Sequence, residues 1–207
     1  MKPGRIISAS FYERDTEIVA RDMLGKLLQC NTPEGVTSGI IVETEAYVGE
    51  HDAACHAAAG LTARTAPLYE RAGIAYVYFI YGMYWCVNAV TRAAGLPSAV
   101  LVRAVEPVEG IPLMRRRRPH AHRDRDLTNG PGKLCLAMGI TGAMNRQSLQ
   151  RGSLVVRDYA SYPDSAVTVT PRIGIRHAAD WPLRWFVSGN EYVSGSRQPS
   201  LQTLPRK

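Results

Sequence analysis

The sequence predicts an α+β fold in one domain, with a curved, mainly antiparallel β-sheet, flanking helices and a protruding aromatic β-hairpin. Three observations support this class. Apolar residues recur at helical spacing early in the chain, strand-like stretches follow in the middle, and residues 76–88 place six aromatic side chains around a glycine. With 207 residues, 45% of them apolar and 21% charged, the chain is long enough to bury one substantial core.

The first predicted element is a helix over residues 15–29, DTEIVARDMLGKLLQ. Its apolar residues lie at roughly helical spacing, and Thr16 is a plausible N-cap. The segment NTPEG (31–35) predicts a turn, and SGIIVETEAYVG (38–49) then alternates as a strand does. Residues 49–73 are rich in Ala and Gly with weak periodicity, so they predict a long connection of the kind that often carries function.

The aromatic stretch YVYFIYGMYWCVN predicts two paired strands, 75–81 and 84–91. Gly82 is expected to be the first residue of a two-residue type II′ turn between them. Tyr81 then stands at the tip beside Met83, and a rigid ring on a tight turn has the form of a wedge that enters a DNA groove. The alternative is core packing, which must hold for most of the six rings. Tyr81 and Met83 are the expected exceptions, because turn residues cannot both face a core easily.

Further along the chain, SAVLVRAVEP predicts a strand that is apolar except for Arg103. The charge-dense segment 114–126 is expected to be a mobile loop, and TNGPGKLCLAMGI (128–140) to be a glycine-rich entry into a helix. VTVTPRIGIR and LRWFVSG predict short strands.

The whole chain, residues 1–207, is expected to form one domain with loose termini at 1–10 and 196–207. Its 25 Lys and Arg exceed its 18 Asp and Glu, which gives a net charge of +7 and a pI of about 9.4. A basic balance favours polyanionic partners, nucleic acid first and an anionic membrane second.

The four cysteines are isolated, with no CxxC pair, which fits neither a zinc ribbon nor a disulfide framework and predicts reduced thiols in the cytoplasm. The N-terminal segment MKPGRIISAS lacks the apolar core of a signal peptide. The longest nearly uncharged stretch is too short and too polar for a transmembrane helix. We therefore expect no membrane partner.

Glu43, Glu45 and Tyr47 share one face of the strand IVETEAYV, because successive side chains alternate. Two neighbouring carboxylates can serve as a general base and a supporting acid, or they can lie on a solvated edge strand. Arg103, alone among apolar residues, either closes a structural ion pair or reaches an active site. Asn88, the only amide of its strand, needs hydrogen-bond partners if it points inward.

The segment HDAACH (51–56) offers several metal-ligand side chains, but it is only half a ligand set and no second cluster has diagnostic spacing. His120 and His122 lie in an Arg-rich run, where solvent or phosphate is their expected environment. No metal site is predicted.

Taken together, these motifs resemble the alkyladenine, or 3-methyladenine, DNA glycosylases. The resemblance covers nearly the whole chain, through DTEIVARDMLGK, VETEAYVG, DAACH, YVYFIYGMYWCVN, LVRAVEPVEG, NGPGKL and LRWFV. It implies that Glu45 is the general base that activates water, and that Arg103 lies beside that water and the target phosphates. It also implies a pocket for the extracted base and a side chain that fills the gap in the duplex; the pocket residues are Tyr47, His56, Tyr78 and Asn88, the last excluding the 2-amino group of guanine, and the gap-filling residue is Tyr81.

Thr62, Arg64 and Lys133 are the expected phosphate contacts, the last because it follows a helix entry rich in free amide donors. The run 115–118, four arginines, supplies either non-specific attraction or a solvated surface. The chain departs from the family's usual pattern in three places, which are Ile40, Ala63 and residues 68–73. Loss of prolines there is expected to loosen the loop, and Glu70 to add an unfavourable charge near phosphate.

The resemblance implies a monofunctional glycosylase that releases alkylated or deaminated purines from double-stranded DNA by base flipping and so initiates base excision repair. No lysine lies near VETEAY or in the aromatic hairpin to form a Schiff base. The enzyme is expected to need no cofactor, to be a monomer and to be cytoplasmic, at the nucleoid if bacterial. The alternatives are a non-catalytic nucleic-acid-binding protein and, less well supported, a glycosidase acting on sugar polymers, which shares the carboxylates but gives no reason for a wedge.

Overall fold

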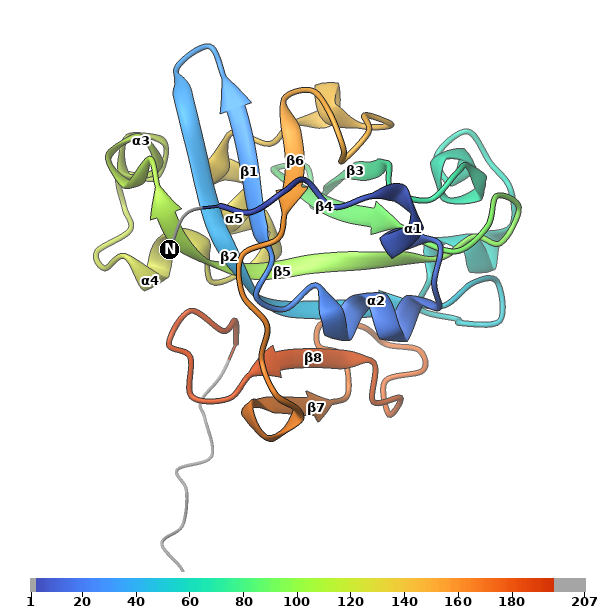
Figure 1. Cartoon of the computed structure of the whole chain (residues 1–207). Coiled ribbons are helices and arrows are strands. Elements are labelled where there is room, and N and C mark those ends of the chain that lie inside the picture. The colour runs from blue at the N-terminus through green and yellow to red at the C-terminus, as the bar shows by residue number, and fades with distance from the viewer. Residues whose placement is uncertain (1–2, 196–207) are drawn as a thin grey trace, which may run out of the picture.

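In the computed structural model, which describes residues 3–195, eight strands form one sheet in which all paired strands are antiparallel (Figure 1). Six strands lie in the spatial order β3-β4-β5-β2-β1-β6, while β8 pairs with β2 and β7 with β8. The strands are β1 (Leu27–Thr32), β2 (Gly35–Tyr47), β3 (Ala75–Ile80), β4 (Tyr84–Val90), β5 (Ala99–Glu109), β6 (Leu154–Arg157), β7 (Val167–Thr170) and β8 (Arg184–Val187). This arrangement confirms the predicted α+β class.

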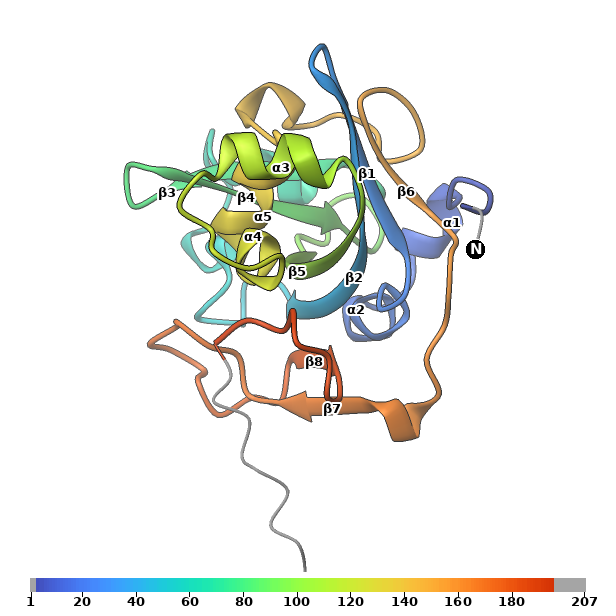
Figure 2. The ribbon, with the colours of Figure 1, turned by 90° about the vertical axis from the view of Figure 1, so that its left-hand side faces the viewer.

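The central strand β2 changes partners along its length. Its first half pairs with β1 and its second half with β8, while β5 follows its other edge. The pairing of β2 with β5 shifts register on both sides of Glu43, and such β-bulges bend a strand. The curvature of β2, visible in Figure 2, therefore falls where the two predicted carboxylates lie.

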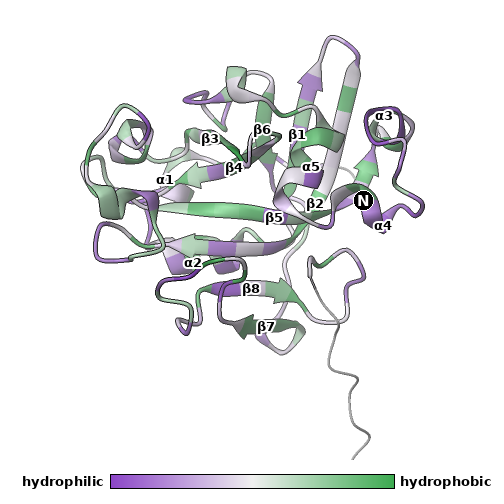
Figure 3. Ribbon diagram, turned by 180° about the vertical axis from the view of Figure 1, so that it is seen from behind, coloured by the Kyte–Doolittle hydropathy of each residue, from purple (hydrophilic) through white to green (hydrophobic). Residues whose placement is uncertain are grey.

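In the described part of the chain, five α-helices pack around the sheet: α1 (Ala9–Tyr12), α2 (Thr16–Asp22), α3 (Ile111–Arg117), α4 (Arg125–Thr128) and α5 (Pro131–Met138). Helix α2 packs on β2 and β5, and α5 packs on β4 and β5. Strand β5 is hydrophobic along most of its length, as Figure 3 shows, because both of its faces are covered. Thr44 donates its hydroxyl to the Ala20 carbonyl of α2 at 2.8 Å, so its neighbours Glu43 and Glu45 face the other side of the sheet.

The aromatic stretch forms the predicted hairpin of β3 and β4, with Ile80 opposite Tyr84, and its turn projects beyond the neighbouring elements in Figure 2. The predicted type II′ turn is wrong by one residue. Tyr81 (φ 55°) and Gly82 (φ 66°) both have positive φ, and the Met83 amide donates to the Ile80 carbonyl at 3.2 Å. Two positive φ values with this hydrogen bond are the pattern of a type I′ turn, which matches the twist of the strands.

The predicted helix over residues 15–29 is wrong in its second half. Helix α2 ends at Asp22, Gly25 has a left-handed φ of 88°, and strand β1 begins at Leu27. Apolar residues buried on both faces of β1 imitate helical spacing, and so periodicity alone did not separate the two elements. The N-cap is Asp15, while the Thr16 hydroxyl contacts that of Thr91.

The long connection between β2 and β3 contains two 3₁₀ turns, His56–Ala59 and Ala66–Tyr69. Two further 3₁₀ turns are Gly142–Met144 and Asp164–Ala166. The charge-dense segment 114–126, expected to be a loop, lies partly in α3 and α4.

The N-terminal segment is not loose from Gly4 on, because the Gly4 amide donates to the Asp158 carbonyl at 2.7 Å and Ile7 is buried. The expected loose terminus at 196–207 lies outside the described residues. Within residues 3–195, no helix is long and apolar enough to cross a membrane.

Candidate active site

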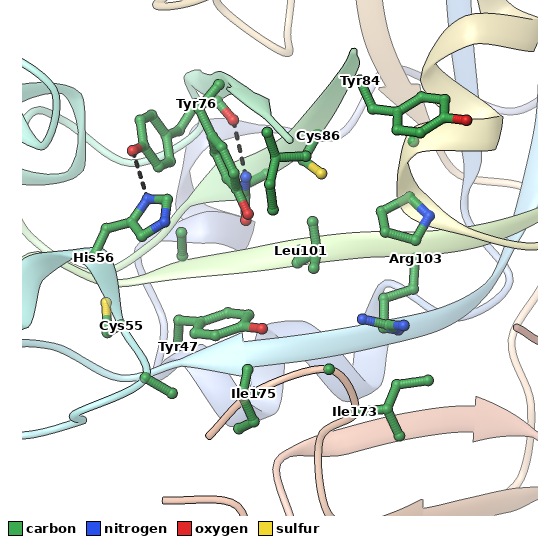
Figure 4. A pocket seen from close by; sticks show the side chains of 18 of the residues that line it. Tyr47, Cys55, His56, Tyr76, Tyr84, Cys86, Leu101, Arg103, Ile173 and Ile175 are labelled. Carbon is green, nitrogen blue, oxygen red and sulfur yellow. Dashed lines mark hydrogen bonds between the residues drawn. The ribbon is translucent and has the colours of Figure 1, made fainter. Parts of the chain in front are cut away.

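A cavity of about 400 Å³ opens between the aromatic hairpin, β2, β5, the start of α5 and the loop after β7 (Figure 4). Most of its lining is aromatic or aliphatic, and its main polar groups are Tyr47, His56, Asn88 and Arg103. The structure thus brings together, around one cavity, side chains that are far apart in the sequence. Its size lies in the range of small-ligand pockets, which is about 300–1,000 Å³.

Glu45 lies behind the cavity wall, fully buried, with 0% of the residue exposed. Its Oε2 accepts hydrogen bonds from the Tyr47 hydroxyl at 2.8 Å and from Arg103 at 3.1 Å, and its Oε1 accepts one from the Ile173 amide at 2.9 Å. All three donors belong to residues that line the cavity. The carboxylate is therefore one side chain removed from any bound molecule, and the alternative of a solvated edge strand is wrong.

Glu43 belongs to the same hydrogen-bond network and does not line the cavity. It is fully buried and accepts hydrogen bonds from Arg103 at 3.0 Å, from Arg184 at 2.7 Å, and from both the amide and the hydroxyl of Ser194. Arg103 thus satisfies both interpretations of a lone arginine in an apolar strand, since it closes a buried ion pair and also reaches the cavity.

A β-bulge places Arg103 between the two carboxylates. Glu43 pairs with Ala104 and the next residue, Thr44, pairs with Val102, so Arg103 has no partner opposite it. Bulges of this kind re-aim a side chain, and here the guanidinium is directed toward both glutamates. Burial lowers the pKa of Arg103, but the charges of Glu45 and Glu43 outweigh it and the net shift is upward, so the guanidinium stays charged.

Three aromatic rings form the opposite wall. The ring centroid of His56 lies 4.5 Å from that of Tyr78 and 5.9 Å from that of Tyr76, whose hydroxyl shares a 2.8 Å hydrogen bond with His56 Nδ1 (Figure 4). Burial raises the pKa of Tyr78, and burial together with the charge of Arg64 lowers that of His56. Both groups are therefore neutral near pH 7. Asn88 is buried, lines the cavity and donates its amide to the Tyr76 carbonyl at 3.0 Å.

Tyr47 forms the facing wall, as Figure 4 shows. Burial and the neighbouring Glu45 raise the pKa of its hydroxyl, which keeps the proton that it donates to that carboxylate. The guanidinium of Arg172 lies 4.7 Å from the Tyr47 ring centroid. Arg172 is in turn held by Asp52 through two hydrogen bonds of 2.5 and 2.8 Å.

Of the predicted groove and phosphate residues, Tyr81 alone is among the described residues that line the cavity. Tyr81 is 78% exposed and touches the cavity rim, while Met83 is 64% exposed and lies outside the lining. Thr62 and Arg64 are exposed in the long connection, where the Thr65 hydroxyl bonds to Thr62 and ties the loop together. Lys133 is exposed on α5 and donates to Asn129 at 2.8 Å.

The four-arginine run is mostly engaged within the fold. Arg115 pairs with Asp124, Arg117 with Glu34, and Arg118 donates to the carbonyls of Asp126 and Leu127. The departure Glu70 pairs with Arg146 at 3.1 Å, and Ile40 packs against the core.

The side chains of HDAACH do not converge on one point, since Asp52 binds Arg172 and His56 binds Tyr76. Among residues 3–195, no three His, Cys, Asp or Glu side chains are grouped to hold a metal ion.

Sequence reasoning missed Arg184, Asp52 and Arg172. Arg184 gives the same signal as Arg103, a lone arginine in an apolar strand, and could have been found by it. Asp52 and Arg172 are 120 residues apart and carry no local signal that joins them. Gly132, part of the predicted glycine-rich helix entry, has a packing role that the sequence does not show: a Cβ there would come within 2.8 Å of Tyr84, so only glycine lets α5 approach the hairpin this closely.

The family model described as Methylpurine-DNA glycosylase (MPG) matches residues 10–191. The chain is similar to proteins named "Putative 3-methyladenine DNA glycosylase" in several organisms. The protein from Myxococcus xanthus is 48% identical over 92% of this chain and 97% of its own length. Those from Methanocella arvoryzae and Methanoculleus marisnigri are 45% and 48% identical, over 94% and 91% of this chain, and each is covered over 98% of its length.

Proposed function

The chain belongs to the methylpurine-DNA glycosylase family and is a DNA glycosylase of the hydrolase type, and from this premise we propose its substrate and mechanism. It hydrolyses the N-glycosidic bond of alkylated or deaminated purines in double-stranded DNA, such as 3-methyladenine, 7-methylguanine, hypoxanthine and ethenoadenine. The damaged nucleotide is first rotated out of the helix, because its glycosidic bond is hidden inside a duplex. Release of the base leaves an abasic site, where base excision repair begins.

One observation carries this proposal: a fully buried carboxylate, Glu45, lies directly behind a ring-lined cavity and is oriented by Arg103. A carboxylate has about four acceptor sites, and three of those of Glu45 are occupied. The free site is on Oε1, beside the Ile173 amide, and this is where the attacking water binds. Glu45 is fully buried, so water cannot reach Oε1 as the protein stands. The loop contact between Ile173 and Oε1 must therefore open when DNA binds.

Glu45 then has two tasks in one step. It takes a proton from the water, and its negative charge stabilises the oxocarbenium-like sugar as the bond to the base breaks. Arg103 pairs with the carboxylate and holds it in place. No lysine is among the described residues that line the cavity, which supports a monofunctional enzyme without strand cleavage.

The aromatic walls bind the extracted base. Rotating a nucleotide out of the duplex costs a few kcal/mol, least for a damaged pair, and stacking on an aromatic ring returns about 1–3 kcal/mol per base. Tyr47 on one side and Tyr78 with His56 on the other supply these rings. Asn88, which lines the cavity, discriminates against normal guanine through its 2-amino group.

The exposed rim engages the duplex. Tyr81, which is raised on the turn, fills the gap left by the extracted base, and Met83 contacts the groove beside it. Thr62, Arg64 and Lys133 contact phosphates. We also propose that the enzyme acts as a monomer, without a cofactor, and in the cytoplasm.

The replacement Glu45→Gln tests the assignment. It keeps the size and most hydrogen bonds of the side chain but removes its charge, so release of 3-methyladenine and hypoxanthine should fall by at least about 100-fold. Binding to a lesion duplex, measured by gel shift, should remain within a few-fold of wild type because the aromatic walls are intact.

Two results would contradict the proposal. Equal release by both proteins means that Glu45 is not the base. No release by the wild-type protein from a panel of lesion duplexes, together with duplex binding, favours a non-catalytic nucleic-acid-binding protein.

A further inference from the structure

The Tyr47 side chain contacts two charged groups. Its hydroxyl donates to Glu45, and the guanidinium of Arg172 lies over the ring at 4.7 Å. Arg172 is buried and does not line the cavity, whereas Tyr47 does. The guanidinium therefore covers the rear face of the ring and leaves the front face to the ligand.

Arg172 cannot move away from this position. Asp52 binds both of its terminal nitrogens at 2.5 and 2.8 Å, and the Ala46 carbonyl accepts a further hydrogen bond at 3.0 Å. Both side chains of the ion pair have 0% of their surface exposed. Asp52 is fixed in turn by the amides of Val48 and Ala54.

A fixed cation behind an aromatic ring changes what the front of the ring prefers. An aromatic face attracts cations through its quadrupole, by about 0.5–2 kcal/mol. Arg172 already uses that attraction from behind, and its field also opposes a second positive charge on the front face, with little screening in a buried site. A neutral base loses less from this arrangement than a cationic one. Asp52 cancels part of the arginine's field and so limits the effect.

Among the residues that the structure describes, no buried cation lies behind the rings of the opposite wall. Arg64 lies 5.6 Å from the Tyr78 ring centroid, but this arginine is exposed and is screened by solvent. Of the two aromatic walls, the Tyr47 side is therefore the one with a buried fixed charge behind its ring.

We propose that the Asp52–Arg172 ion pair is a specificity-determining element, which sets how well the cavity accepts a cationic alkylated purine relative to a neutral damaged purine. The inference rests on the proposed function, because it names a property of the same base pocket. It predicts that the net charge behind Tyr47 controls the ratio of the two activities.

The test measures single-turnover release of 7-methylguanine, which is cationic, and of hypoxanthine, which is neutral, from otherwise identical duplexes, with uncatalysed loss subtracted. Each ratio is compared with that of wild type, because 7-methylguanine also carries the 2-amino group that Asn88 disfavours, and Asn88 is the same in every variant. Asp52→Asn leaves the positive charge of Arg172 uncompensated, so the cationic-to-neutral ratio should fall by about three- to tenfold. Arg172→Met removes that charge, so the ratio should rise by a similar factor. The ratio is taken within one protein preparation and is therefore independent of the folded fraction.

The double variant Asp52→Asn/Arg172→Met protects the test against misfolding, because it leaves no lone buried charge. Its ratio should rise above that of wild type. As a comparison, Arg64→Met should weaken both activities together and change the ratio by less than about twofold.

The outcomes separate the two levels of the argument. A ratio that is unchanged, or that shifts in the same direction in both single variants, overturns the specificity role and leaves a structural ion pair. A wild-type enzyme that releases neither base overturns the proposed function itself, and this inference with it.

Discussion

Two regions that are predicted to be functional are held in opposite ways. One is the pair of carboxylates behind the cavity, Glu43 and Glu45, which we call the floor; the other is the tip of the aromatic hairpin, Tyr81 and Met83. Glu43 and Glu45 are fully buried, and each has at least three hydrogen-bond donors. Tyr81 and Met83 are mostly exposed and are fixed only by the turn. A change in the floor must therefore alter folding and chemistry together, whereas a change at the tip should alter contact with DNA and little else.

The difference follows from the two tasks. A group that stabilises charge works best when it is preorganised in a site without bulk water, because it then needs no rearrangement during the reaction. A side chain that enters DNA must instead be free of protein contacts before it binds. Tyr81 adopts a left-handed φ of 55°, which is uncommon for a residue with a side chain, and backbone strain of this kind often marks a functional position.

The largest effect is expected from Glu43→Gln, which breaks the floor without touching the cavity lining. Glu43 is shared by Arg103 and Arg184, and removal of one partner from a buried ion pair costs about 3–5 kcal/mol. Urea unfolding should show this loss. The surface pair of Lys26 and Asp158 supplies the control, since Asp158→Asn should cost at most about 1 kcal/mol. Equal losses in the two variants would mean that the floor is not a coupled network.

Tyr81→Ser addresses the tip and should have the reverse signature. The free energy of unfolding should change by no more than about 0.5 kcal/mol, because the ring is 78% exposed. The Kd for a lesion duplex should rise by roughly 5- to 160-fold, since base–aromatic stacking is worth about 1–3 kcal/mol. Tyr81→Phe keeps the ring and should bind as wild type does. Unchanged affinity and excision kinetics in Tyr81→Ser would remove the wedge role.

Much of this comparison follows from local sequence signals. Three features follow from residues that are adjacent in the sequence, and the structure has them as predicted. They are the two hairpin strands, the alternation of VETEAY and the apolar strand around Arg103. The location of the turn at Tyr81 rather than Gly82 did not follow, because a non-glycine residue in the left-handed region is disfavoured locally and must be held by its context.

The floor was predictable only in part. Glu45 and Arg103 stand out as charges in apolar strands, but their contact depends on a bulge that pairs Glu43 with Ala104 and leaves Arg103 unopposed. Bulges arise from the pairing of two distant strands and leave no mark in either one. The Asp52–Arg172 pair has the same origin, since it joins two loops that meet only in the folded chain.

A smaller effect is expected from Gly82→Ala, which tests whether the shape of the tip matters apart from its side chains. Gly82 has a φ of 66°, and a Cβ at this position would meet no atom within 4 Å, so the cost is backbone strain alone. We expect a loss of about 1 kcal/mol in unfolding free energy and an unchanged lesion affinity, because strain that is present in both the free and the bound protein cancels in the Kd. A loss of affinity in place of stability would show that the free turn relaxes and that DNA binding must restore its shape.

The smallest effect concerns His56, which lies between the two regions in the aromatic wall and should make stability depend on pH. Burial, and then the charge of Arg64, lower its pKa below the ordinary value of 6.5, so the folded protein binds this proton less readily than the unfolded chain. The stability that His56 supports is therefore complete above about pH 6.5 and is lost as the pH falls toward the lowered folded-state pKa. The pKa of Asp52 is also lowered, from 3.8, and so this carboxylate titrates below that window.

Urea unfolding at about pH 7.5 and about pH 5 should show a smaller pH-dependent loss of unfolding free energy in His56→Gln than in wild type, while the exposed control His120→Gln should match wild type. The same loss in all three proteins would mean that the pH dependence arises from other groups. His56 in the aromatic wall would then contribute as little to the pH dependence of stability as an exposed histidine does.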